Sequence, residues 1–243
     1  MLAGVFAAAA LMPADGPIAQ FMRRFQDGGD LRLGGDVRRT LMFLQQFGDA
    51  ASSIFALLVI FLAAPTLRRR LPDAIGAWLA AGAAVQAAKM LIGRPRPGII
   101  FGTPMEGWSS PTKLLFPWTA YPLPRPGPDG TVGYQFRHAW EFWGGISSDL
   151  WSMPSSHTSA AAALAVILTR LVPPLRPLML AMVIIVAASR VLFGAHYPSD
   201  VVLGGAMGGV FAALAMDGAW GGRLWSRLRG DAGRGASQYT SGA

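Results

Sequence analysis

The chain has 243 residues, of which 52% are hydrophobic and only 14% are charged. Apolar runs such as "SSIFALLVIFLAA" exclude both an ordinary soluble domain and a disordered chain, because they favour the hydrocarbon core of a bilayer. The net charge of +8 comes from short basic clusters between apolar runs rather than from one continuous patch, so no nucleic acid partner is expected.

The predicted elements are helices, which gives an all-α fold: a polytopic membrane helix bundle with about six transmembrane helices. The first apolar segment, residues 1–12, spans only ~18 Å at ~1.5 Å per residue, against a hydrocarbon core of ~30 Å. We therefore expect a short or truncated helix. Residues 13–40 follow, and their apolar residues recur at helical spacing, so this stretch is expected to lie flat in the membrane interface. Five further spans are predicted at residues 41–64, 74–92, 157–172, 177–194 and 200–220.

A long loop, residues 93–156, separates the second and third of these five spans, and its Pro and Gly content argues against another span. It holds five of the eight tryptophans, which are Trp108, Trp118, Trp140, Trp143 and Trp151. Indole rings prefer the headgroup level, so the loop is expected to cap the bundle near the membrane surface. The alternative is a loop that its tryptophans anchor at the membrane surface and that takes no part in a reaction. The domain organisation predicted is a stretch at 1–40, a membrane domain at 41–220 and a disordered cytoplasmic tail at 221–243.

Positive charge predicts the orientation of the bundle. Nine arginines fall in the loop at 67–72, the turn at 170–176 and residues 223–234, which share one side if the five spans alternate. Short loops rich in arginine stay cytoplasmic. The long loop and the turn at 195–199 would then face the periplasm or the cell exterior. Five arginines within residues 23–39 fall on the outer side and oppose this scheme.

Three polar clusters fall at the outer ends of different predicted helices. "KMLIGRPRP" ends the helix at 74–92, "MPSSHTS" opens the next helix, and "SRVLFGAHYPSD" joins the last two helices. The candidate site residues in these clusters are Lys89, Arg94, Arg96, Ser155, Ser156, His157, Arg190, His196 and Asp200.

Each cluster taken alone has an ordinary explanation. The basic residues can reach lipid headgroups with their long side chains, "PSS" is a favourable helix start, and Asp200 complements a helix dipole. Their conjunction favours a site, because charges at membrane depth are costly and two of the three histidines lie in these clusters.

The residue types fit phosphoryl transfer. Lys89, Arg96 and Arg190 would neutralise phosphoryl oxygens, and Ser155 with the amides of Ser156 and His157 would bind an anion at a helix N-terminus. Asp200 would hold one ring nitrogen of His196 and leave the other nucleophilic, while His157 would protonate the leaving oxygen. No metal or other cofactor is expected, because the fixed cations supply the charge and the chain has no cysteine.

The three clusters resemble the signature motifs of the type-2 phosphatidic acid phosphatase superfamily. The first motif reads Lys89-MLIGRP-Arg96-Pro97, the second reads Pro154-Ser155-Ser156-His157, and the third reads Ser189-Arg190-VLFGA-His196-YPS-Asp200. The first and third match in spacing and in every fixed residue. Ser156 departs from the pattern, because the family usually has glycine there.

The resemblance implies a membrane lipid phosphatase that works through a phosphohistidine on His196. Its long outer loop and "GRPRP" run favour the bacterial envelope branch, with lipid A phosphate or undecaprenyl diphosphate as substrate. Phosphatidylglycerophosphate or phosphatidic acid is the alternative substrate. A soluble vanadate-binding relative is disfavoured by the spanning helices. A non-catalytic protein that binds anionic lipid, or a transporter, is the alternative of another class. The expected partners are the lipid phosphate and membrane lipids, with no obligate protein partner.

Overall fold

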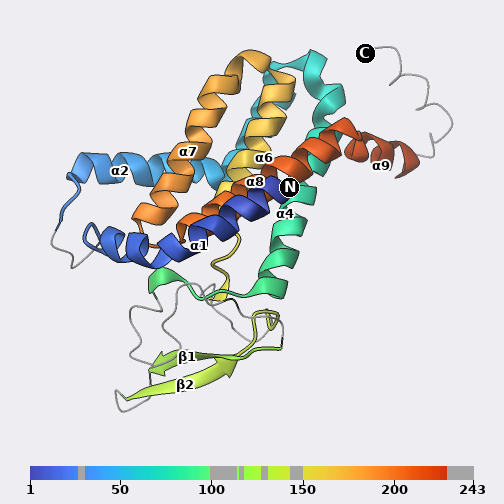
Figure 1. The fold of residues 1–243 in the computed structure, drawn as a ribbon. Coiled ribbons are helices and arrows are strands. Elements are labelled where there is room, and N and C mark those ends of the chain that lie inside the picture. The colour runs from blue at the N-terminus through green and yellow to red at the C-terminus, as the bar shows by residue number, and fades with distance from the viewer. Residues whose placement is uncertain (27–30, 99–113, 115–117, 127–130, 143–149, 229–243) are drawn as a thin grey trace.

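The computed structural model describes residues 1–26, 31–98, 114, 118–126, 131–142 and 150–228. The helices form a bundle, and a two-stranded hairpin lies beyond one end of it (Figure 1). The elements in chain order are α1 (Leu2–Arg23), α2 (Gly35–Leu44), the 3-10 helix η1 (Gln45–Gly48), α3 (Ala50–Ala63), η2 (Pro65–Arg70), α4 (Leu71–Ile92), β1 (Tyr121–Pro126), β2 (Val132–Arg137), α6 (Ser156–Leu171), η4 (Pro173–Leu175), α7 (Arg176–Leu192), α8 (Pro198–Asp217) and α9 (Trp220–Leu228).

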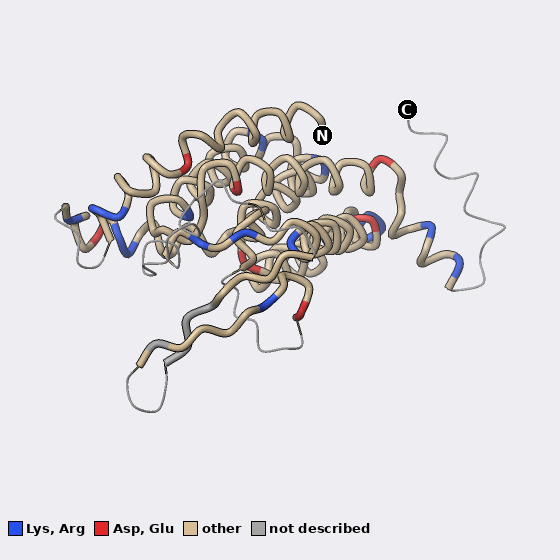
Figure 2. Tube along the Cα trace, turned by 60° about the horizontal axis from the view of Figure 1, so that its bottom comes forward, with Lys and Arg blue, Asp and Glu red and all other residues tan. Residues whose placement is uncertain are grey.

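The helical membrane bundle is confirmed, but the expected number of spans was too high. Among the described residues, four helices are long and apolar enough to cross a membrane, and a bent helix pair brings the number to at most five. The four are Leu2–Arg23, Pro65–Ile92, Pro173–Leu192 and Pro198–Asp217. The central helix α6 has only 16 residues, which is about 24 Å at ~1.5 Å per residue and shorter than the hydrocarbon core. Charged residues lie mainly toward helix ends and connections, with long uncharged stretches between them (Figure 2).

Helix α1 corrects the prediction of a short segment followed by an interfacial stretch. It continues without a break from Leu2 to Arg23, although Pro13 and Pro17 lie inside it. Proline is tolerated inside a bundle helix where neighbouring groups compensate the lost backbone hydrogen bonds. The helix lies across α8 (Figure 1), so residues 13–23 belong to the bundle.

The predicted span at 41–64 is broken. Helix α3 meets the preceding segment, Gly35–Gly48, at 66°. Asp49 has extended backbone at the break, and its carboxylate accepts a hydrogen bond from the amide of Ala51 at 2.8 Å, which caps α3. An aspartate directly after a glycine is a helix-start signal within an otherwise apolar run.

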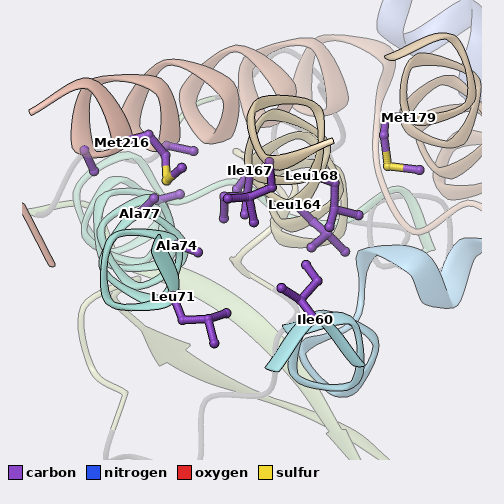
Figure 3. Close-up of a cluster of buried hydrophobic side chains, with 14 residues drawn as sticks. Ile60, Leu71, Ala74, Ala77, Leu164, Ile167, Leu168, Met179 and Met216 are labelled. Atoms are coloured by element: carbon purple, nitrogen blue, oxygen red, sulfur yellow. The ribbon is translucent and has the colours of Figure 1, made fainter. Parts of the chain in front are cut away.

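The main hydrophobic core lies where α6 meets α4, α3 and α8 (Figure 3). Buried side chains from these helices interlock there, among them Ile60, Leu71, Ala77, Leu164, Ile167, Leu168 and Met216. Other apolar side chains on α3 and α7 point outward, with Phe55 68% exposed and Leu180 62% exposed. The inner helix α6 is therefore buried over much of its length, while the outer helices present apolar faces suited to lipid.

Two glycines allow α8 to lie directly against α6. A Cβ atom on Gly204 would collide with the carbonyl oxygen of Ser155, and one on Gly208 would collide with that of Ser159. Small residues permit such close backbone approach between membrane helices. This contact places the start of α8 beside the start of α6, and so joins the second and third polar clusters.

The long segment between α4 and α6 contains a hairpin that the sequence did not predict. β1 and β2 pair antiparallel, from Tyr121 opposite Arg137 to Pro126 opposite Val132. Three prolines in β1 disfavour a strand, which explains why its sequence reads as a loop. Trp118 is 77% exposed, whereas Trp108 and Trp143 of the predicted tryptophan cap lie outside the described residues.

Candidate active site

The end of α4, the start of α6 and the α7–α8 turn lie at the same end of the bundle (Figure 1). The Nζ atom of Lys89 donates to the carbonyl oxygen of Trp151 at 3.1 Å, just before α6. The amide of Ser155 donates to the carbonyl oxygen of Asp200 at 3.0 Å. Arg96 reaches the carbonyl oxygen of Ala195 at 3.5 Å. The structure therefore brings all three predicted clusters together.

His196 is held by a backbone carbonyl rather than by the carboxylate expected from the sequence. Its Nδ1 atom lies 2.7 Å from the carbonyl oxygen of Ser152 and 3.7 Å from Oδ2 of Asp200. A carbonyl oxygen only accepts, so Nδ1 carries the proton and the lone pair is on Nε2. The carbonyl oxygen of Ser152 therefore fixes the tautomer, whereas the sequence led us to expect that Asp200 would do so.

The imidazole of His196 is neutral over a wide pH range. The ring is only 2% exposed. Burial lowers the pKa of His196 to about 4; the nearby carboxylate charge of Asp200 opposes this change, and the charges of Arg96 and Arg190 add to it. Near neutral pH the lone pair on Nε2 is therefore available for attack.

Asp200 lies in a buried ionic network. Its Oδ1 atom accepts from Nη1 of Arg94 at 2.5 Å, and its Oδ2 atom accepts from Oγ of Ser152 at 2.5 Å and from the amide of Tyr197 at 2.9 Å. The second terminal nitrogen of Arg94, Nη2, donates to Oδ2 of Asp15 at 2.7 Å. The side chains of Asp15, Arg94 and Asp200 are all 0% exposed.

Asp15, in α1, is the residue that sequence reasoning missed. It also accepts hydrogen bonds from the amide and the hydroxyl of Ser199, at 3.0 and 2.5 Å. Although burial lowers the pKa of Arg94, the charges and hydrogen bonds of Asp200 and Asp15 raise it overall, so Arg94 stays charged. The available signal was one acid inside an apolar segment, which implies a buried cationic partner.

The start of α6 has the capping geometry that its sequence predicts. The hydroxyl of Ser155 accepts from the amide of Thr158 at 3.4 Å and from its hydroxyl at 3.1 Å. Ser155 is buried, while Ser156 and His157 are partly accessible. The first amides of the helix, which include those of Ser156 and His157, lack partners within the helix and give this end a partial positive charge.

Three cations surround the two histidines. Lys89 is 4% exposed, and it interacts electrostatically with Arg96 and Arg190. The same two arginines act on both His157 and His196. Arg190 also donates to Oε1 of Gln45 at 3.3 Å. This cation cluster, defined as Lys89, Arg96 and Arg190, concentrates positive charge near His157 at the start of α6 and near His196, which suits a phosphate group.

The site offers poor ligands for a metal ion. In the part of the chain that the structure describes, no group of three or more His, Asp and Glu side chains is arranged to hold one. The two buried carboxylates, Asp15 and Asp200, are both already paired with the guanidinium of Arg94. The arrangement instead provides fixed cations and a neutral imidazole, which can perform nucleophilic attack on an electrophilic phosphorus.

Comparisons with known proteins point the same way. A family model described as the PAP2 superfamily matches residues 70–222. Over 78 residues (32% of this chain and 42% of the relative), the sequence is 40% identical to decaprenylphosphoryl-5-phosphoribose phosphatase of Mycobacterium tuberculosis. Over 63 residues (26% of this chain and 27% of the relative), it is 41% identical to lipid A 1-phosphatase of Rhizobium etli. The matched segments span less than half of each of these relatives.

A solved structure shares the fold. The transmembrane PAP2-type phosphatidylglycerolphosphate phosphatase from Bacillus subtilis superposes with a TM-score of 0.55 at 15% identity, over 90% of this chain and 93% of that one. The shared architecture includes the mostly helical bundle described above.

Proposed function

Because the chain belongs to the PAP2 superfamily, we propose that it is a membrane lipid phosphatase that hydrolyses a phosphate monoester or diphosphate of a lipid. The observation that carries this proposal is the arrangement at His196. The Ser152 carbonyl holds the proton on Nδ1, and the cation cluster and the start of α6 lie on the side where a phosphate would bind.

In the first step, Nε2 of His196 attacks phosphorus and forms a P–N bond while the bond from phosphorus to the leaving oxygen breaks. Lys89, Arg96 and Arg190 neutralise the phosphoryl oxygens, with the amides at Ser156 and His157. The ring gains positive charge as the P–N bond forms. The Asp200 carboxylate, 3.7 Å from Nδ1, stabilises that charge.

His157 completes the reaction. An anionic phosphate among the cations favours its protonated form, which donates a proton to the leaving oxygen. In the second step His157 accepts a proton from water as the water oxygen attacks phosphorus, and the P–N bond breaks to regenerate His196 and release phosphate. Because the ring of His196 is 2% exposed, the long cationic side chains must move aside to admit the phosphate.

The substrate class is proposed from two supports. The sequence favours the envelope branch, with lipid A phosphate or undecaprenyl diphosphate. The names of the curated relatives, a lipid A 1-phosphatase and a decaprenylphosphoryl-5-phosphoribose phosphatase, favour the same class. A phosphatidic acid or phosphatidylglycerophosphate substrate is the alternative.

A phosphate-release assay tests the function directly. Purified protein in detergent is given a panel of these lipid phosphates, and we expect release that survives excess EDTA and is inhibited by vanadate, which mimics five-coordinate phosphorus. Radiolabelled substrate should leave acid-labile phosphate on the wild type and none on His196→Ala. Turnover by His196→Ala, or loss in EDTA that a divalent ion restores, would contradict the mechanism. Lipid binding without any release would favour the non-catalytic alternative.

We also propose that the site faces the periplasm or the cell exterior. The arginines of η2, and Arg170 and Arg176 around η4, lie at the end of the bundle opposite the site (Figure 1). Short arginine-rich loops resist translocation. A cytoplasmic reporter fused after residue 228 should be active, and an export-dependent reporter inserted after residue 129 should also be active. The reverse result would place the site in the cytoplasm.

A further inference from the structure

A cavity lies beside the proposed active site, between the end of α1, helix α2, η1 and the end of α7. Its volume is about 410 Å³, and its lining includes Phe25, Gln26, Arg38, Gln45, Arg190 and Phe193. We call it the Arg38 pocket. Its size lies at the lower end of the range for small-molecule sites of roughly 300–1,000 Å³, so it fits a headgroup rather than a whole lipid.

The Arg38 pocket is continuous with the cation cluster. Arg190 lines the pocket and belongs to that cluster, and its Nη1 atom donates to Oε1 of the buried Gln45 at 3.3 Å. Ala195 also lines the pocket, and its carbonyl oxygen lies 3.5 Å from Nη1 of Arg96. Because Arg190 belongs to both the pocket and the cluster and Ala195 directly precedes His196, the Arg38 pocket borders the proposed phosphate site.

The lining has the chemistry of an anion site at a membrane interface. Arg38 and Arg190 supply positive charge, and Gln26 and Gln45 supply amides. The described lining residues include no carboxylate, while Phe25 and Phe193 give the pocket an apolar side. Guanidinium groups bind phosphate oxygens through paired hydrogen bonds. The combination suits an anionic group attached to a lipid.

Most of the wall comes from outside the region that the family model covers. Gln26, Arg38 and Gln45 precede residue 70, where that match begins. The shared chemistry resides in residues 89–200, so a wall built by α1, α2 and η1 is placed to select substrates rather than to perform the reaction.

We propose that the Arg38 pocket binds a second phosphoryl group of the substrate, adjacent to the phosphate that is removed. Arg38 is then a specificity-determining residue, and the chain prefers a lipid diphosphate to the corresponding monophosphate. This inference rests on the proposed function and specifies the substrate of the same site.

The test compares a polyprenyl diphosphate with the monophosphate of the same chain length. Initial rates give kcat/KM for each, and the selectivity is their ratio. We expect Arg38→Gln to reduce the selectivity about tenfold, the size of one lost charge-assisted hydrogen bond, and Arg38→Lys to restore part of it. The matched control is Arg39→Gln, because the Arg39 side chain is 80% exposed and pairs with Asp36 at 2.6 Å. It should leave the selectivity unchanged.

A binding measurement separates failure of the pocket from failure of the proposed function. Each lipid is titrated into His196→Ala protein, with and without Arg38→Gln. Tighter binding of the diphosphate that depends on Arg38 supports the pocket. If the wild type then releases no phosphate, that second result counts against the proposed phosphatase activity and not against the pocket. Equal effects of Arg38→Gln on both lipids, in rate or in binding, or no effect on either, would overturn the inference.

Discussion

Arg94 and Arg96 are two residues apart in "GRPRP", yet they serve different regions of the site. The side chain of Arg94 is 0% exposed and binds both Asp15 and Asp200, and its guanidinium lies 4.2 Å above the ring of Tyr197. Arg96 is only partly buried, and its charge acts on Lys89, Arg190 and both histidines. One arginine therefore pairs with carboxylates, and the charge of the other acts on the basic residues and histidines of the site.

The difference separates residues that hold the helices together from residues that we propose act on the phosphate. In the buried network one guanidinium is hydrogen-bonded to two carboxylates. These bonds connect α1, the end of α4 and the start of α8. In the cation cluster the charges of Lys89, Arg96 and Arg190 act on one another, an arrangement that a bound phosphate would stabilise. His196 lies between the two regions, with Nδ1 on the side of the network.

The largest expected effect comes from the two carboxylates of the network. Asp200→Asn should lower kcat by roughly 10³–10⁴-fold, because it removes the charge beside Nδ1 of His196. Asp15→Asn loses the same kind of pairing with Arg94 but does not reach the imidazole, so kcat should fall by less than about tenfold. Phosphate release at saturating substrate measures both. Equal losses would show that Asp15 acts on the reaction as strongly as Asp200.

The two arginines provide the next comparison. Arg94→Met leaves two buried carboxylates without a cation, and breaking a buried pair costs about 3–5 kcal/mol. Its free energy of unfolding in detergent should fall by that amount, or the protein should fail to fold. Arg96→Met should keep its unfolding transition within about 1 kcal/mol and lose roughly 10²–10³-fold in kcat.

Thermal unfolding followed by circular dichroism measures the first effect, and phosphate release measures the second. Asp15→Asn separates a folding defect from a catalytic one, because it weakens the same network from α1. A stable and inactive Arg94→Met protein, or an unfolded Arg96→Met protein, would contradict the division between the two regions.

The sequence was sufficient to locate the three polar clusters and insufficient for the residues that pack behind them. Lys89, His157 and His196 occur at fixed spacings, and the helix ends predicted around them agree with the structure to within a few residues. Asp15 pairs with Arg94 across 79 positions, and no local pattern links an acid in one helix to a cation so distant. The acceptor for His196 is the backbone carbonyl of Ser152, which any residue would supply, so only the fold reveals it.

The smallest expected effect is a shift in pH dependence, and it compares the influence of the two regions on one imidazole. Burial lowers the pKa of His196 from 6.5 to about 4. Protonation removes the lone pair on Nε2, so kcat/KM should fall as the pH drops through about 4 rather than through 6.5. Between pH 5 and 6.5 the ring of His196 is more than roughly 90% neutral, so protonation of this ring should not limit kcat/KM in that range once substrate ionisation near pH ~6 is corrected.

Variants then show which charges set the pH at which kcat/KM falls, the acid limb of the profile. Arg96 lowers the pKa of His196, so Arg96→Gln should move the acid limb to higher pH, whatever its effect on the maximal rate. Asp200 raises the same pKa, so Asp200→Asn should move the limb to lower pH. Arg39→Gln, on the exposed face of α2, should leave it in place. The position of the limb is read from kcat/KM against pH for each protein. A limb near 6.5 in the wild type, or one that moves in the same direction in both site variants, would show that burial between opposing charges does not govern this histidine.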